Sequence, residues 1–192
     1  MFFKIKSYLQ FLFKSTNQHG VHSPFVYQLV TKCFYNKKKL EVYDTIKTWN
    51  LRDEENSAFK LKTLKLLFRL PTYLNYQNIF LSKGTPKIIS QIWSSQNELD
   101  NTSKIDTHPT YDLIYIDLHK DILSVAEVIE FFSYTHNDSL VLLRGIHNSS
   151  EHLLLWDTLK QHPQVQVTID TFYLGFVFFR KEQAKEHFTI RL

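Results

Sequence analysis

Residues 111–118 read YDLIYIDL, a near-continuous apolar run with the length of a β-strand. Such runs are typical of strands that are buried on both faces of a parallel sheet. A second apolar run, SLVLLR at residues 139–144, follows a segment with helical character at residues 122–134. Strand, helix and strand in succession predict a βαβ unit, and therefore a domain of the α/β class.

The same alternation extends to both sides of this unit. Residues 78–82 form a short apolar strand upstream, and a helix at residues 151–161 leads downstream to the strand VQVTID at residues 165–170. The strand YLGFVFFR at residues 173–180 begins after only two more residues. This spacing forces an antiparallel pair, because a parallel return needs a long crossover. The sequence therefore predicts a mostly parallel sheet that finishes in an antiparallel hairpin.

The N-terminal third of the chain is predicted to be helical. Its helices are expected near residues 1–15, 24–34, 40–49 and 58–70, the last of them ending before Pro71. We expect one domain over residues 1–192, with a helical extension at 1–70 in front of an α/β core at 78–192. A hydrophobic share of 43% and a charged share of 22% fit a globular domain rather than a disordered chain.

The first predicted helix is amphipathic. The apolar residues at helical spacing are Phe2, Ile5, Leu9 and Leu12, with Phe13 close by. Lysine and glutamine residues interrupt the apolar run, which excludes a signal-peptide core and the ~20 apolar residues of a membrane span. We expect this apolar stripe to dock on the domain, and peripheral contact with a membrane surface is the alternative.

Charge and cysteine content narrow the choice of partners and compartment. The formal net charge of +4 is mild, so we expect no nucleic-acid partner. Cys33 is the single cysteine, which excludes internal disulfides and a cysteine-based zinc cluster and fits the reducing cytoplasm. Since Cys33 lies in an apolar helical stretch, we expect its thiol to be buried and inert.

Four segments carry a resemblance to a known family. They are STNQHGVHSPFVYQLVTKCFY (15–35), YDLIYIDLHKD (111–121), NDSLVLLRGIH (137–147) and HPQVQVTIDTFYLGFVFFRKEQAKEHFTIRL (162–192). In these segments the chain resembles a bacterial family of class I S-adenosylmethionine-dependent methyltransferases of the O-methyltransferase type. The resemblance implies a shortened Rossmann-like sheet, and S-adenosylmethionine as the cofactor of the intact enzymes.

The cofactor site implied by this resemblance is depleted in the present chain. The family holds the methionine part of the cofactor on a glycine-rich turn after the first strand, where the backbone must approach closely. The equivalent stretch here, IFLSKGTP at residues 79–86, keeps a single glycine. Ser82, Gly84 and Asp117 are the remaining candidates for contact with a cofactor.

The segment after this turn is too short for the family's usual succession. Each βαβ unit takes roughly 30 residues or more, and too few separate Phe80 from Asp112 for two further strands. The second and third strands are therefore expected to be missing or collapsed into the loop at residues 97–110. The carboxylate that would bind the ribose is expected to be absent with them.

The metal site implied by the resemblance is also altered. Metal-dependent members hold a divalent cation with carboxylates that follow the fourth and fifth strands. Asp117 stands at the first of these positions, but Arg144 and Gly145 stand where the family has an acidic pair. We therefore expect no metal, and a structural salt bridge between Asp117 and Arg144 is one interpretation of the pair.

A second interpretation is a functional rim. Asp117, His119, Arg144 and His147 follow two predicted parallel strands, and α/β proteins bind ligands at the carboxyl ends of such strands. These four side chains, and His22 in the N-terminal leader, are the candidate catalytic residues. A nucleophilic triad is not expected, because no serine lies in a nucleophile-elbow pattern.

Two functions lead, ahead of a third in which the basic N-terminal helices bind a membrane surface or a nucleic acid. The first is a degenerate, non-catalytic methyltransferase-like protein that acts as a protein-binding or regulatory module, with a protein partner or a second copy of itself and no cofactor. The alternative is a working methyltransferase that binds S-adenosylmethionine in an atypical site and acts on an unknown acceptor. In either case we expect a cytoplasmic protein.

Overall fold

The computed structural model describes residues 2–52, 59–96, 99–104 and 110–192. Its strands form one sheet in the order β2 (Asp100–Thr102), β1 (Asn78–Leu81), β3 (Tyr111–Asp117), β4 (Thr135–Arg144), β6 (Leu174–Phe178), β5 (Val167–Asp170) and β7 (Glu186–Thr189). The pairs of β6 with β4 and with β5 are antiparallel, and the other pairs are parallel. The predicted mostly parallel sheet with a C-terminal antiparallel hairpin is confirmed.

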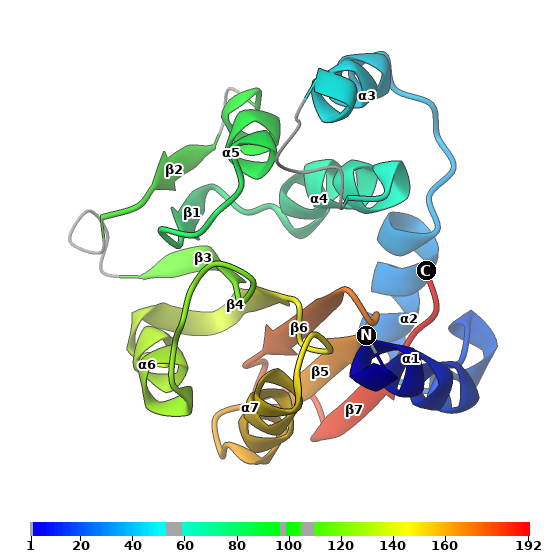
Figure 1. Ribbon diagram of the computed structural model, residues 1–192, viewed down its shortest axis with the longest axis vertical. Helices are drawn as coiled ribbons and strands as arrows, with labels where there is room; N and C mark the ends of the chain where they lie inside the picture. Colours follow the sequence, from blue (N-terminus) through cyan, green and yellow to red (C-terminus); the bar gives the residue numbers. More distant parts are fainter. Residues whose placement is uncertain (1, 53–58, 97–98, 105–109) are drawn as a thin grey trace.

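Helices cover both faces of the sheet (Figure 1). They are α1 (Phe2–Lys14), η1 (Gln18–Gly20), α2 (Pro24–Gln28), the π-helix η2 (Leu29–Phe34), α3 (Val42–Arg52), α4 (Leu61–Leu74), α5 (Lys87–Ser94), α6 (Val125–Glu130), η5 (Phe131–Tyr134) and α7 (Ser150–Gln161). None of the helices in the described part of the chain has the length and apolar character needed to cross a membrane.

Strand β3 lies between two hydrophobic clusters, one on each face of the sheet. Leu113 and Tyr115 belong to the cluster that includes residues of η2, α4 and α5, whereas Ile114 and Ile116 belong to the cluster under α6 and α7. Because successive side chains of a strand point to opposite faces, both sets are buried. This two-sided burial explains the near-continuous apolar run at residues 111–118.

The second and third strands were both expected to be missing or collapsed into the loop at residues 97–110, and this is wrong for the second strand. Strand β2 pairs in parallel with β1, with Asn78 opposite Asp100 and Phe80 opposite Thr102. The connecting helix α5 has only eight residues, so this βαβ unit fits between residues 78 and 102. No further strand is described between β2 and β3, and residues 97–98 and 105–109 of the predicted loop lie outside the described residues.

The prediction that a helix ends before Pro71 is also wrong, because α4 continues through it to Leu74. A proline inside a helix leaves the carbonyl four residues earlier without its donor. Here that carbonyl belongs to Leu67, and the buried indole of Trp93 donates to it from Nε1 at 2.8 Å. A tertiary hydrogen bond replaces the helical one, and α4 runs on to its left-handed C-cap at Asn75.

Helix α1 docks on the domain, but with a different face from the one predicted. Its buried residues are Ser7 and Phe11, and the Phe11 ring lies 5.5 Å from that of Phe172. In the predicted docking stripe, Phe2 and Phe13 are 91% and 90% exposed. Ser7 makes a hydrogen bond to the domain, which an apolar residue of the stripe could not make. The stripe therefore points to solvent.

Strand β7 was not predicted from the sequence. It pairs in parallel with β5, from Val167 opposite Glu186 to Asp170 opposite Thr189. The segment EHFT carries one large apolar residue, Phe188, and its side chains are only partly buried. An edge strand of this kind lacks the apolar pattern that identifies a central strand.

Candidate functional site

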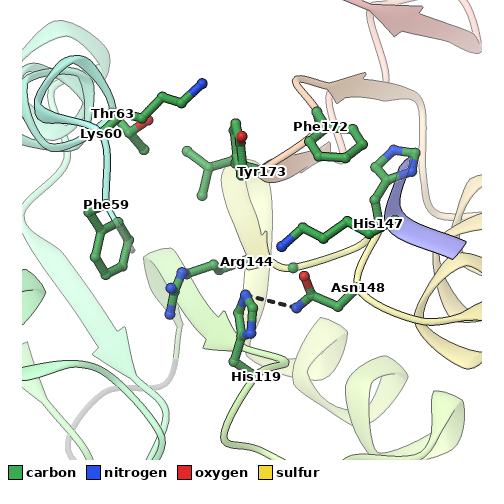
Figure 2. Close-up of a pocket in the computed structure, with 12 residues that line it drawn as sticks. Phe59, Lys60, Thr63, His119, Arg144, His147, Asn148, Phe172 and Tyr173 are labelled. Atoms are coloured by element: carbon green, nitrogen blue, oxygen red, sulfur yellow. Dashed lines mark hydrogen bonds between the residues drawn. The ribbon is translucent and has the colours of Figure 1, made fainter. Parts of the chain in front are cut away.

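A cavity of about 60 Å³ lies at the carboxyl ends of β3 and β4 (Figure 2). Arg144 at the end of β4 and the loop residues His119, His147 and Asn148 form one part of its wall. Helix α1, the start of α4 and the turn between β5 and β6 complete it with residues that include Lys4, Lys60 and Tyr173. Three of the predicted site residues, His119, Arg144 and His147, thus meet at one cavity.

Asp117 and Arg144 form a buried ion pair beside the cavity. The two residues are direct partners in the register of β3 and β4, and Arg144 Nη1 donates to Asp117 Oδ2 at 2.6 Å. The other carboxylate oxygen of Asp117 accepts the backbone N–H of His119 at 3.0 Å. Burial raises the pKa of the Asp117 carboxyl, and the positive charge of Arg144 opposes that shift. The predicted salt bridge is present through Oδ2, and Oδ1 of Asp117 is occupied by the backbone of His119.

The guanidinium of Arg144 also stacks on an aromatic ring. Its central carbon lies 4.0 Å from the ring centroid of Phe59, and Figure 2 shows Arg144 between Phe59 and His119. No three His, Cys, Asp or Glu side chains of the described segments gather closely enough to hold a metal ion. A cationic side chain therefore stands where the family resemblance implied a bound cation.

His119 lies at the rim of the cavity as an uncharged imidazole. Asn148 donates from Nδ2 to Nε2 of His119 at 2.8 Å. Burial, followed by the positive charges of Arg144 and Lys4, lowers the pKa of His119 to about 4. Gly145 supports this contact, because its φ of +91° favours glycine and a Cβ there would lie 2.3 Å from Asn148 Nδ2.

His147 belongs to a hydrogen-bonded chain that the sequence did not reveal. Its Nδ1 lies 2.5 Å from Ser7 Oγ, its Nε2 lies 2.7 Å from Asp170 Oδ2, and all three residues are buried. The imidazole also stacks on Phe172 at 4.8 Å. Ser7 lies inside α1, where helical N–H groups are already paired and cannot stabilise an oxyanion. The chain Ser7–His147–Asp170 therefore serves to dock α1.

Part of this chain could have been anticipated from the sequence. Asp170 ends the predicted strand VQVTID, and β5 runs parallel to β4, so its carboxyl end lies at the same edge of the sheet. Ser7 carries no such signal, because it is 140 positions away from His147. His22, the remaining catalytic candidate, is exposed in the loop before α2 and does not line the cavity.

The candidate cofactor residues Ser82, Gly84 and Asp117 meet at the ends of β1 and β3. Ser82 Oγ accepts the backbone N–H of Asp117 at 3.3 Å. The N–H of Gly84 donates to Asp121 Oδ1 at 2.8 Å, and a Cβ at Gly84 would lie 2.8 Å from side-chain atoms of both Lys120 and Asp121. The loop after β3 thus covers the one glycine on which a cofactor could rest.

The other part of the expected cofactor site is the carboxyl end of β2. In the family, an acidic residue at the carboxyl end of the second strand binds the ribose. Strand β2 ends at Thr102 and continues with Ser103 and Lys104. Among the described residues, the carboxyl end of β2 therefore carries no acidic side chain that could bind a ribose.

Comparisons with known proteins support the fold assignment. Neither family sequence models nor curated proteins give a match. Among solved structures, the chain is similar to a protein assigned as a caffeoyl-CoA O-methyltransferase from Staphylococcus aureus, at 13% identity and a TM-score of 0.53 over 73% of this chain and 93% of that one. It is also similar to the S-adenosylhomocysteine-bound methyltransferase PaMTH1 of Podospora anserina, at 9% identity and a TM-score of 0.51 over 83% and 97%. The chain therefore has the Rossmann-like fold of the class I O-methyltransferases.

Proposed function

We propose that this protein has the methyltransferase fold without methyltransferase activity and works as a binding module for another protein. The contact between Gly84 and Asp121 carries this proposal. A class I enzyme needs open glycine backbone at this turn, and here the chain's own carboxylate takes the N–H that a ligand would use. The pairing of Asp117 with Arg144 supports the same conclusion, because it removes the carboxylate from metal binding.

The outward face of α1 is the surface that we propose for the partner. Six of the eleven exposed large hydrophobic side chains among the described residues lie on α1: Phe2, Phe3, Ile5, Leu9, Phe13 and Tyr8, of which Tyr8 also packs its ring on Phe172. An apolar helix face of this kind typically enters a hydrophobic groove of another protein. The helix carries lysines and no acidic residue, so an acidic rim around that groove would be complementary.

Calorimetric titration with S-adenosylmethionine and S-adenosylhomocysteine tests the loss of the cofactor site. We expect no heat of binding at millimolar ligand from a sample that still unfolds cooperatively. Micromolar binding, roughly −8 kcal/mol, would contradict the proposal.

The partner surface is tested with the substitution Leu9→Glu, with Gln10→Glu on the neighbouring flank of the same helix as a control of equal charge. If the partner is a second copy, light scattering should give a dimer for the wild type and the control and a monomer for Leu9→Glu. If the partner is another protein, Leu9→Glu should abolish capture of that partner and Gln10→Glu should not. If the protein instead sediments with anionic liposomes and Leu9→Glu abolishes this sedimentation, the apolar stripe binds a membrane surface.

One observation favours the alternative of a working methyltransferase with an atypical cofactor site. Two buried polar atoms have no hydrogen-bond partner among the described residues: Asp121 Oδ2, beside Gly84, and Tyr115 Oη, whose group interacts electrostatically with Asp121. A polar ligand in place of the closed loop would satisfy them. Under this alternative, S-adenosylmethionine binds and Asp117→Ala weakens it.

We infer that the protein works in the cytoplasm. Its single cysteine, Cys33, is buried as a free thiol, and the chain has no disulfide to form in an oxidising compartment.

A further inference from the structure

Three cationic side chains from distant parts of the sequence line the cavity at the carboxyl ends of β3 and β4. They are Lys4 on α1, Lys60 at the start of α4 and Arg144 at the end of β4. No carboxylate is among the described residues that line this cavity. Asp117, behind the wall, offsets one of the three charges through its pair with Arg144. A second carboxylate behind the wall, that of Asp170, is hydrogen-bonded to His147, so the three cations that face the cavity outnumber the two carboxylates behind it.

The start of helix α4 adds to this positive potential. Lys60 is the N-cap of α4 and makes no side-chain capping hydrogen bond, and the first turn contains no acidic residue. Both features are the reverse of the usual preference, because the N-terminus of a helix carries a partial positive charge. Thr63 from this first turn lines the cavity. The helix dipole and the lysine therefore act in the same direction.

Aromatic rings hold two of the cations at the cavity. The Lys60 ammonium lies 5.1 Å from the ring centroid of Tyr173, and the Arg144 guanidinium stacks on Phe59. Arg144 uses Nη1 for Asp117, and its Nε and Nη2 make no hydrogen bond to any residue in the described part of the chain. These stacked contacts leave N–H donors of both cations for a ligand.

The neutral state of His119 is a second sign of the same potential. Burial is the largest cause of its lowered pKa of about 4, and the charges of Arg144 and Lys4 lower this pKa further. His119 therefore adds no positive charge at neutral pH, and its Nε2 accepts from Asn148 rather than donating to an anion. The lysines and the arginine remain the cationic donors of the cavity.

We propose that this cavity binds the phosphate group of a small phosphorylated molecule between Lys4, Lys60 and Arg144. A phosphate monoester carries a charge of about −1.5 to −2 and three strong acceptor oxygens at pH 7, which suit three cationic donors better than a carboxylate does. The volume of about 60 Å³ has room for such a group and not for a nucleoside. Since S-adenosylmethionine carries no phosphate, the inference is independent of the proposed function.

The first test is calorimetric titration with inorganic phosphate at constant ionic strength. We expect saturable binding at one site, weakened roughly tenfold or more in the double variant Lys4→Ala/Lys60→Ala. The matched control is Lys6→Ala/Lys62→Ala, which removes the same charge from the same two helices at residues that do not line the cavity. Affinity that is equally weakened in both variants, or no saturable binding in the wild type, would overturn the proposal.

A second readout comes from His119 itself. Inorganic sulfate is a suitable probe because it stays dianionic over the pH range in which this imidazole titrates. Bound sulfate should raise the pKa of His119 from about 4, as followed by NMR against sodium chloride of equal ionic strength. An unchanged pKa at a sulfate concentration that saturates the calorimetric signal would place the anion elsewhere and contradict the proposal.

The phosphate could belong to a soluble ester or to a lipid headgroup, and vesicles separate these sources. Sedimentation with phosphatidic acid vesicles that is lost in Lys4→Ala/Lys60→Ala and kept in Lys6→Ala/Lys62→Ala would assign a lipid headgroup. Binding of inorganic phosphate without vesicle sedimentation would assign a soluble ester. If neither inorganic phosphate nor the vesicles bind, the result of the S-adenosylmethionine titration is unaffected. The phosphate proposal and the proposed function therefore fail independently of each other.

Discussion

Arg144 places a cation at the end of β4, where the family resemblance implied acidic metal ligands, and it binds the carboxylate of Asp117. Its guanidinium and the Asp117 carboxylate are both buried, so each has lost most of its hydration. A buried pair of this kind adds little net stability compared with apolar residues, but removing one partner leaves an uncompensated charge. The pair is therefore a structural requirement of this chain.

This requirement can be measured by urea denaturation. We expect Arg144→Met to lower the free energy of unfolding by about 3–5 kcal/mol, and Asp117→Asn/Arg144→Met to recover most of that loss. The control is Asp138→Asn, which breaks the exposed pair of Asp138 with Arg180 and should cost less than about 1 kcal/mol. An Arg144→Met cost as small as that of the control would show that the buried pair is dispensable.

Cys33 is the second residue with a clear titration signature. Burial raises the pKa of its thiol to about 12. A thiol in the unfolded chain ionises near pH 9, so between pH 9 and 12 the unfolded state loses a proton that the folded state keeps. The free energy of unfolding should therefore fall with rising pH in this window, and that of the Cys33→Ala variant should fall less steeply. Parallel pH profiles for the two proteins would contradict the assignment.

At the level of secondary structure elements, Trp93 on α5 enables α4 to pass through Pro71. Trp93→Phe leaves the Leu67 carbonyl buried without a donor, which should cost about 1–3 kcal/mol in addition to the lost ring volume. In a Pro71→Ala background the alanine N–H supplies the missing helical donor. Trp93→Phe should therefore lower the free energy of unfolding by at least about 1 kcal/mol less in that background. Equal costs in the two backgrounds, measured by thermal or urea unfolding, would show that the indole hydrogen bond does not matter.

Helix α1 shows how one element can serve two surfaces. Its inner face carries Ser7, which is tied to His147 and Asp170, and its outer face presents the apolar stripe to solvent. The sequence predicted the helix and its apolar stripe correctly. It could not predict which face docks, because that choice depends on the distant imidazole of His147 and on the ring of Phe172.

For the whole molecule, the N-terminal helices are part of the core. Val26, Leu29 and Val30 are buried in the same cluster as the centre of the sheet, and the Phe34 ring lies 4.9 Å from that of Phe176 on β6. Removal of residues 1–34 would expose this side of β6 to water. We expect the truncated protein to be insoluble, and a soluble truncation that melts cooperatively in calorimetry would contradict this.

The carboxyl edge of the sheet was only partly predictable. Parallel strands bring their carboxyl ends together, so the convergence of His119, Arg144 and His147 follows from the strand pattern alone. Lys4 and Lys60 join them only because α1 and α4 are folded back over this edge. No local pattern marks these lysines, since their role depends on contacts between segments far apart in the chain.

By itself, the sequence determined the α/β class, the parallel strands and the closing hairpin, because apolar runs and short connections act locally. It also showed a single glycine at residues 79–86 and Arg144 followed by Gly145, where the family resemblance implies a glycine-rich turn and an acidic pair. Only the tertiary structure decided that the short polar segment at residues 100–102 is a strand, that α4 continues past Pro71 and that Asp121 covers Gly84. Each of these depends on a hydrogen bond to a distant residue, and such partners are set by the packing of the whole chain.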